Sequence, residues 1–131
     1  FLPEGQSLGP AVEPDLLREI KNSATLKLNG DHDVFGDGRV RLISAPGHTQ
    51  GHQVLFVNLA EYGPLVLSGD LYHFRFSRAQ RRVPLFNVNV DQTLASMDKV
   101  ESLVKEEGAE FWIEHDLALF QTLKTAPDFY Q

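Results

Sequence analysis

The sequence predicts an α/β fold, layered in the α+β manner, in which helices pack on a sheet. Several short apolar segments have the length of strands and are separated by glycine-containing turns. Residues 92–107 carry apolar side chains at steps of three and four, which is the spacing of an amphipathic helix. An apolar strand and a short helix follow it. This order of strands, long helix, strand and helix favours helices packed on a sheet.

Each element has a local reason in the sequence. Asp91 is a good N-cap for helix 92–107, and Gly108 is its natural stop. A last helix over 117–124 precedes Pro127, and the arginine-rich residues 71–90 are expected to be irregular. Turns are expected at 29–31, 36–38 and 63–64. The predicted strands are 25–28, 32–35, 40–43, 53–59, 65–68 and 111–113.

Length and composition restrict the class of protein. With 131 residues, 42% of them apolar, the chain suits one domain over 1–131. Within it we expect an arm and a short helix from Asp15 to Lys21 over 1–24, and the sheet and helices over 25–131. The formal net charge of −6 argues against nucleic acid or an anionic membrane as a partner. No apolar run approaches the roughly 18 residues that span a bilayer.

The absence of cysteine excludes disulfides, thiolate metal sites and cysteine nucleophiles. The chain begins at Phe1 and shows no targeting segment, which leaves the compartment open between cytoplasm and periplasm.

The sharpest local pattern is Ala-Pro-Gly-His-Thr-Gln-Gly-His at residues 45–52, directly after a predicted strand. Pro46 and the two glycines indicate a loop, so His48 and His52 are not expected to share a helix face. A histidine held by a rigid loop suits a metal ion, because neutral imidazole binds Zn²⁺ well. A turn with exposed histidines remains an equal alternative.

Two further polar groups follow apolar strands. Asp70 comes after strand 65–68 and His115 after strand 111–113. Taken singly, Asp70 could simply cap a helix and His115 could be a structural histidine. The recurrence of His48, Asp70 and His115 at three strand ends is what favours a metal centre at one sheet edge.

These three motifs, in this order, resemble the metallo-β-lactamase superfamily, and within it the N-acyl homoserine lactonase-like branch. The flanking residues 63–67 and 92–96 fit as well, and the resemblance extends over about residues 30–126. It implies an αββα sandwich with two metal ions, usually zinc, at one edge of its two sheets. It also implies that His48, Asp70 and His115 are metal ligands, with Asp70 bridging both ions and His52 supporting the loop.

The activity that this resemblance implies is hydrolysis of an ester, lactone or related acyl compound by metal-bound hydroxide. The family's His-x-His-x-Asp-His motif is missing, since the upstream residues Asp31, His32 and Asp33 do not match it. The chain therefore resembles a truncated, C-terminal half of the sandwich, which implies a mixed sheet with helices on one face. We expect it to hold at most one zinc or other divalent ion, and to be weakly active or inactive alone.

A half-sandwich would leave one apolar sheet face uncovered, so we expect a homo-oligomer or association with a missing N-terminal half. The resemblance also implies a small-molecule substrate, and no nucleic acid or membrane partner is expected. A non-catalytic oligomerising remnant and a simple metal-binding module remain alternatives to the hydrolase.

The branch carries tyrosine three residues after the bridging aspartate, whereas this chain has His73 there and Tyr72 one step earlier. Asp70, Tyr72 and His73 are accordingly the candidate catalytic residues, and the departure widens the substrate range beyond homoserine lactones. An arginine cluster could bind an anion, although surface salt bridges are the simpler interpretation. Four aromatic residues could line a pocket, although core packing is the simpler role. The arginines are Arg75, Arg78, Arg81 and Arg82; the aromatics are Phe74, Phe76, Phe86 and Trp112.

Overall fold

The computed structural model describes residues 23–131. The helix expected from Asp15 to Lys21, and nearly all of the expected arm over 1–24, lie outside the described residues. The single-domain organisation over 1–131 stays a prediction.

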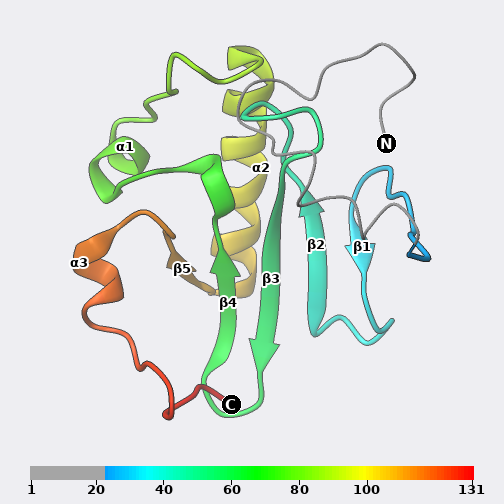
Figure 1. The fold of residues 1–131 in the computed structure, drawn as a ribbon, viewed down its shortest axis with the longest axis vertical. Coiled ribbons are helices and arrows are strands. Elements are labelled where there is room, and N and C mark those ends of the chain that lie inside the picture. Colours follow the sequence, from blue (N-terminus) through cyan, green and yellow to red (C-terminus); the bar gives the residue numbers. More distant parts are fainter. Residues whose placement is uncertain (1–22) are drawn as a thin grey trace.

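A five-stranded mixed sheet forms the centre of the described part (Figure 1), with the spatial order β1-β2-β3-β4-β5. The first four strands pair antiparallel, and β5 pairs parallel to β4. Strands β2, β4 and β5 therefore run in the same direction, and their C-terminal ends lie at one end of the sheet. The strands are β1 His32–Asp33, β2 Val40–Ser44, β3 Gln53–Leu59, β4 Gly63–Leu67 and β5 Glu110–Trp112.

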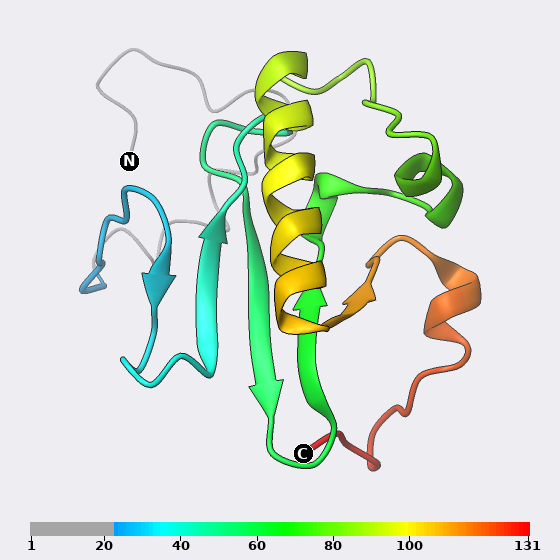
Figure 2. The ribbon, with the colours of Figure 1, turned by 180° about the vertical axis from the view of Figure 1, so that it is seen from behind.

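Helix α2, Val90–Glu107, lies along one face of this sheet (Figure 2). Its residues Met97 and Val100 are fully buried against strand residues such as Phe56 and Val66. The Asn89 side chain caps the helix by accepting a hydrogen bond from the Gln92 amide at 2.9 Å. Burial of this apolar face fixes the helix on the sheet and so fixes the loops at the sheet's end.

Three short helical elements lie in the segments that follow β4 and β5. A 3-10 turn, η3, covers Gly69–Leu71, and helix α1 covers Arg75–Ala79. Helix α3 covers Leu117–Phe120 and is capped by Asp116, whose side chain accepts from the Leu119 amide at 3.0 Å. No helix within residues 23–131 is long and apolar enough to cross a bilayer.

The sheet face away from α2 carries an apolar row across four strands. Strand register places Leu42 beside Leu55, Leu55 beside Leu67, and Leu67 beside Trp112. All four side chains are only partly buried. Tyr62 and Tyr130 pack edge-on against Trp112 at one end of the row.

The predicted fold class is confirmed, and the predicted strand 53–59 has the same bounds as β3. Several local predictions are wrong. Residues 25–28 form no strand, Gly63 and Pro64 belong to β4 rather than a turn, and α1 occupies part of the stretch expected to be irregular. The cap of α2 is Asn89 instead of Asp91, because the chain turns into the helix one step before Asp91.

Candidate metal centre

The loops after β2, β4 and β5 bring His48, Asp70 and His115 together at one end of the sheet. His115 Nε2 lies 2.7 Å from Asp70 Oδ1, and His48 Nε2 lies 3.4 Å from Asp70 Oδ2. Asp70 follows His48 by 22 residues in the sequence, and His115 follows Asp70 by 45 residues. Their convergence follows from the shared direction of the three strands.

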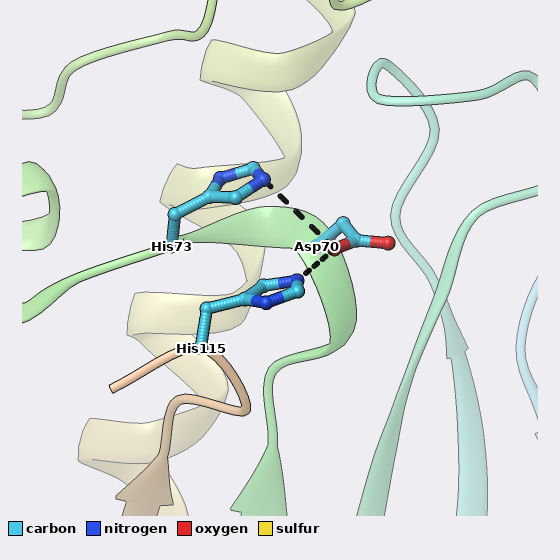
Figure 3. Close-up of side chains that lie close together, drawn as sticks. All are labelled: Asp70, His73 and His115. Carbon is cyan, nitrogen blue, oxygen red and sulfur yellow. Dashed lines mark hydrogen bonds and ion pairs between the residues drawn. The ribbon is translucent and has the colours of Figure 1, made fainter. Parts of the chain in front are cut away.

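Asp70 stands at the centre, with different histidines at its two oxygens. Oδ1 faces His115 and also His73, whose Nε2 is 3.9 Å away (Figure 3), whereas Oδ2 faces His48. Burial alone would raise the pKa of Asp70. The hydrogen bond from His115 and the neighbouring histidines outweigh it, and the net effect lowers the pKa below its usual value. Asp70 is thus an ionised carboxylate surrounded by imidazoles.

A chain of hydrogen bonds orients the His48 ring. Thr93 Oγ1 donates to the Asn89 carbonyl oxygen at 2.7 Å, so its oxygen accepts from Asn87 Nδ2 at 3.0 Å. That leaves Asn87 Oδ1 to accept from His48 Nδ1 at 3.2 Å. In neutral His48 the lone pair is then on Nε2, and it faces the Asp70 carboxylate. A lone pair opposite a carboxylate is an arrangement that a cation stabilises.

His52 has a different task. Its Nε2 accepts the backbone amide hydrogen of Asp70 at 2.9 Å, which assigns the ring proton to Nδ1, and Nδ1 donates to the Ala45 carbonyl at 2.8 Å. Burial lowers the pKa of His52 and so favours this neutral form. With both nitrogens engaged, His52 holds the Asp70 backbone and has no lone pair for a metal.

His73 joins the cluster from the segment after η3. Its ring stacks on His115 with 5.0 Å between centroids and 10° between planes, and Phe86 meets it edge-on at 5.5 Å. Its side chain is 18% exposed. Burial, together with the neighbouring His115, lowers the pKa of His73 and favours the neutral ring.

Tyr72 does not point into this cluster. It is 1% exposed, packs edge-on against Phe111, and lines a separate hollow with Arg78 and Glu101. Burial raises the pKa of its hydroxyl. The alternation of the extended chain at Tyr72 sends its ring into the core and the next side chain, His73, to the site.

The arginines and aromatics of residues 74–86 also have clear positions. Arg78 and Arg81 form ion pairs with Glu101 and Asp98 of α2, and Arg75 pairs with Asp116. Core packing was expected for Phe74, Phe76 and Phe86, but these side chains are exposed. They line an open hollow beside His73 together with Pro84 and Leu85. Trp112 packs against Tyr62 and Tyr130.

The donor set fits a zinc-class cation. Two ligands on one tetrahedral zinc ion lie about 3.4 Å apart, given metal–ligand distances near 2.0–2.1 Å. The spacings of 2.7, 3.4 and 3.9 Å around Asp70 bracket that value. Asp70 and His115 side chains are 40% and 50% exposed, which leaves the site open on one side.

Sequence reasoning missed two supports of the site. Asn87 lies in a stretch without hydrophobic periodicity. It orients the ring of His48 through a hydrogen bond to a residue 39 positions earlier in the sequence. Glu114 accepts a hydrogen bond from Ser68 Oγ at 2.7 Å, which ties the loop carrying His115 to the end of β4. The one sequence signal for either residue is that Glu114 directly precedes His115.

Comparison with known proteins finds relatives named N-acyl homoserine lactonase. The N-acyl homoserine lactonase AttM of Rhizobium johnstonii is 33% identical over 99 residues, which are 76% of this chain and 38% of that protein. AttM of Azorhizobium caulinodans is 32% identical over 107 residues, 79% of this chain and 41% of that protein.

The solved structure of an N-acyl homoserine lactone hydrolase, with the product N-hexanoyl-L-homoserine bound at its catalytic metal center, superposes with a TM-score of 0.70. Its sequence is 26% identical to this chain, and the superposed part covers 79% of this chain and 40% of the solved chain. This chain is a lactonase-like member of the metallo-β-lactamase superfamily. No protein-family model matches the sequence.

Membership in the metallo-β-lactamase superfamily accounts for the mixed sheet with α2 on one face. The chain spans about two fifths of the length of the relatives named above. The resemblance to the lactonase-like branch implies tyrosine at position 73, where this chain places the imidazole of His73 beside Asp70.

Proposed function

We propose that this chain supplies a metal-binding part of a hydrolytic site for lactones, esters or related acyl compounds. His48, Asp70 and His115 are the proposed ligands, and zinc is the proposed metal. The observation that carries this proposal is the position of Asp70, whose two oxygens face different histidines within 3.4 Å. A carboxylate in that position can bridge two cations or bind a single one.

Each residue has a distinct task in this proposal. Asp70 brings the negative charge, and His52 keeps its backbone in place through the 2.9 Å hydrogen bond to the amide. Asn87 holds His48 in the tautomer that presents Nε2 to the site. The Ser68–Glu114 contact fixes the loop on which His115 is carried. When bound, a zinc-class ion supplies Lewis-acid polarisation of a substrate carbonyl.

The substrate range follows from the surroundings of the cluster. The open hollow beside His73 is lined mainly by exposed apolar side chains, with Arg82 among its lining residues. An acyl chain suits such a surface, since burying apolar area there is favourable. The structural relative with a bound N-hexanoyl product makes acyl lactones the first compounds to test.

We expect the rate of this chain alone to be low. Within residues 23–131, the side chains gathered at the site are His48, Asp70, His73 and His115, which suits one ion better than two. The incomplete cage that the sequence predicts therefore remains part of the proposal.

The test combines metal analysis with hydrolysis assays on N-acyl homoserine lactones and simple esters. The purified chain should retain about one zinc and hydrolyse an acyl lactone in a metal-dependent way. His48→Ala, Asp70→Ala and His115→Ala should each lower both metal content and rate, by roughly tenfold or more, because each removes a ligand.

His32→Ala is the matched control, since His32 lies in β1 away from the cluster. It should leave metal content and rate unchanged. Metal content unaffected by all three ligand variants would overturn the ligand set. Metal-independent hydrolysis, or none on any acyl lactone or ester, would overturn the proposed reaction.

A further inference from the structure

We propose that Asp70, His73 and His115 form a three-ligand site for one zinc-class cation, with His73 as the third protein ligand. The proposal deepens the function proposed above and rests on it for Asp70 and His115. It adds a residue that the resemblance to lactonases does not supply as a ligand. It also gives the described part of the chain a metal site that needs no residue from elsewhere.

The geometry of the three groups carries the proposal. One ligand atom from each of Asp70, His73 and His115 lies within 4.8 Å of the other two. The two imidazoles stack almost parallel, and the Nε2 atoms of both face the same oxygen, Oδ1 of Asp70 (Figure 3). Three donors that face one small space can close on a single ion by side-chain movements of about 1 Å, given ligand separations of about 3.4 Å.

His73 is also held in the required orientation. Its ring stacks on the His115 ring and makes an edge-on contact with Phe86. Its Nδ1 is buried and has no hydrogen-bond partner within residues 23–131, while Nε2 points to Asp70. A side chain fixed by its neighbours loses little conformational entropy on binding an ion, which raises affinity.

The charge of the set matches a divalent cation with an open position. Two neutral imidazoles and one carboxylate form the kind of three-ligand set that leaves a fourth zinc coordination position free. Asp70 and His115 are the more exposed members of the set, so the free position faces the open side of the site. Oδ2 of Asp70 remains directed at His48, 3.4 Å away.

The experiment measures Co²⁺ binding by visible absorption, followed by displacement with Zn²⁺. The wild-type chain should give the intense bands of four-coordinate Co²⁺ with one ion per chain. His73→Phe keeps a flat ring against His115 but removes both nitrogens, so it should weaken Co²⁺ binding by at least about tenfold. His32→Ala should bind as the wild type does, and circular dichroism checks that each variant is folded.

A second measurement does not depend on any variant. In the wild-type chain labelled with ¹⁵N in histidine, adding Zn²⁺ should shift Nε2 of His73 and His115 while the signals of His52 stay in place. The absence of a His73 shift, or unchanged affinity in folded His73→Phe, would overturn this inference and leave the proposed function standing. A wild-type chain that binds neither Co²⁺ nor Zn²⁺ would overturn both.

Discussion

His52 Nε2 accepts the backbone amide hydrogen of Asp70, so the residue at the centre of the site is held through its main chain by a histidine whose two ring nitrogens are both hydrogen-bonded. The second nitrogen of His52 donates to the Ala45 carbonyl at 2.8 Å, which ties the turn before His48 to the turn after β4. Gly69 makes the close approach possible. Its φ is +49°, and a Cβ there would meet His52 Nε2 at 2.8 Å.

His52→Ala should therefore destabilise the fold without removing a ligand. The substitution leaves the Asp70 amide and the Ala45 carbonyl without their partner, and unsatisfied polar groups of this kind cost about 1–3 kcal/mol. Urea unfolding of the metal-free chain measures the loss. His32→Ala serves as the reference, and equal stability of the two variants would contradict the role given to His52.

Asn87 controls the tautomer of His48, and its removal should affect metal binding more than folding. Asn87→Ala takes away the acceptor at His48 Nδ1, so the ring can turn or shift its proton to Nε2. Loss of such a supporting hydrogen bond typically costs about 10- to 100-fold in metal affinity. Zn²⁺ affinity from Co²⁺ displacement checks this, with the exposed Asn58→Ala as control. An unchanged affinity in Asn87→Ala would show that His48 is not oriented in this way or is not a ligand.

Gly47 and Gly51 flank His48 but should respond differently to substitution. Gly47 is buried with φ +136°, and a Cβ there would lie 2.6 Å from the Thr93 Cα at the start of α2. Gly51 is exposed, and no atom would lie within 4 Å of its Cβ. Gly47→Ala should lower the free energy of unfolding by about 2 kcal/mol or more, and Gly51→Ala by less than about 0.5 kcal/mol. Thermal unfolding of the pair checks this contrast, and similar midpoints would contradict it.

The recurrence of a polar group after an apolar strand was enough to predict that His48, Asp70 and His115 come together. It succeeds because strands in the same direction place their ends at one edge of a sheet, whatever their separation along the chain. Strand 53–59 was equally predictable, since its apolar run lies between a glycine-rich loop and a turn.

Other features depend on contacts that sequence spacing does not contain. Helix α1 lacks an apolar stripe and is held in part by the Arg78–Glu101 pair with α2. The N-cap residue of α2 depends on where the loop from Asn87 meets the helix. The helix begins at Val90, so Asn89 is its N-cap, although an aspartate such as Asp91 is chemically suitable for that position. That Tyr72 lies inside and His73 at the site depends on how the chain leaves η3.

The Arg78–Glu101 pair should make stability depend on pH in the acid range. Glu101 Oε1 and Oε2 accept from Arg78 Nε and Nη2 at 2.8 and 2.7 Å. The Arg78 hydrogen bond lowers the pKa of Glu101 below its usual value of 4.5, with Arg81 adding to the effect against burial. A carboxylate with a lowered pKa stabilises the fold above pH 4.5 and loses that contribution as the pH falls through its folded-state pKa.

Comparison with Glu101→Gln isolates this contribution. Wild type should be more stable than the variant by about 1 kcal/mol at pH 7, and the difference should shrink as the pH falls below about 4.5. Urea unfolding at a series of pH values measures it, and Glu106→Gln, at an exposed position of α2, should give no such trend. A difference that stays constant down to pH 3 would exclude the pair as its source.

The apolar row of Leu42, Leu55, Leu67 and Trp112 should make the purified chain self-associate. Its side chains are partly exposed on the sheet face away from α2, and monomers rarely leave a continuous apolar patch of large size open to water. In a solution of this chain alone, a second copy is the partner that can cover the row. Leu55 lies in β3, next to both Leu42 and Leu67.

Size-exclusion chromatography with light scattering should give a mass that rises from 14.7 kDa towards twice that value as the concentration increases. Leu55→Lys places a charge in the middle of the row and should return the chain to 14.7 kDa, because burying an unpaired charge is costly. Phe35→Lys is the control, since Phe35 is 72% exposed in the turn between β1 and β2. A wild-type chain that stays monomeric at the highest concentration, or a Leu55→Lys dimer, would exclude this face as the contact between copies.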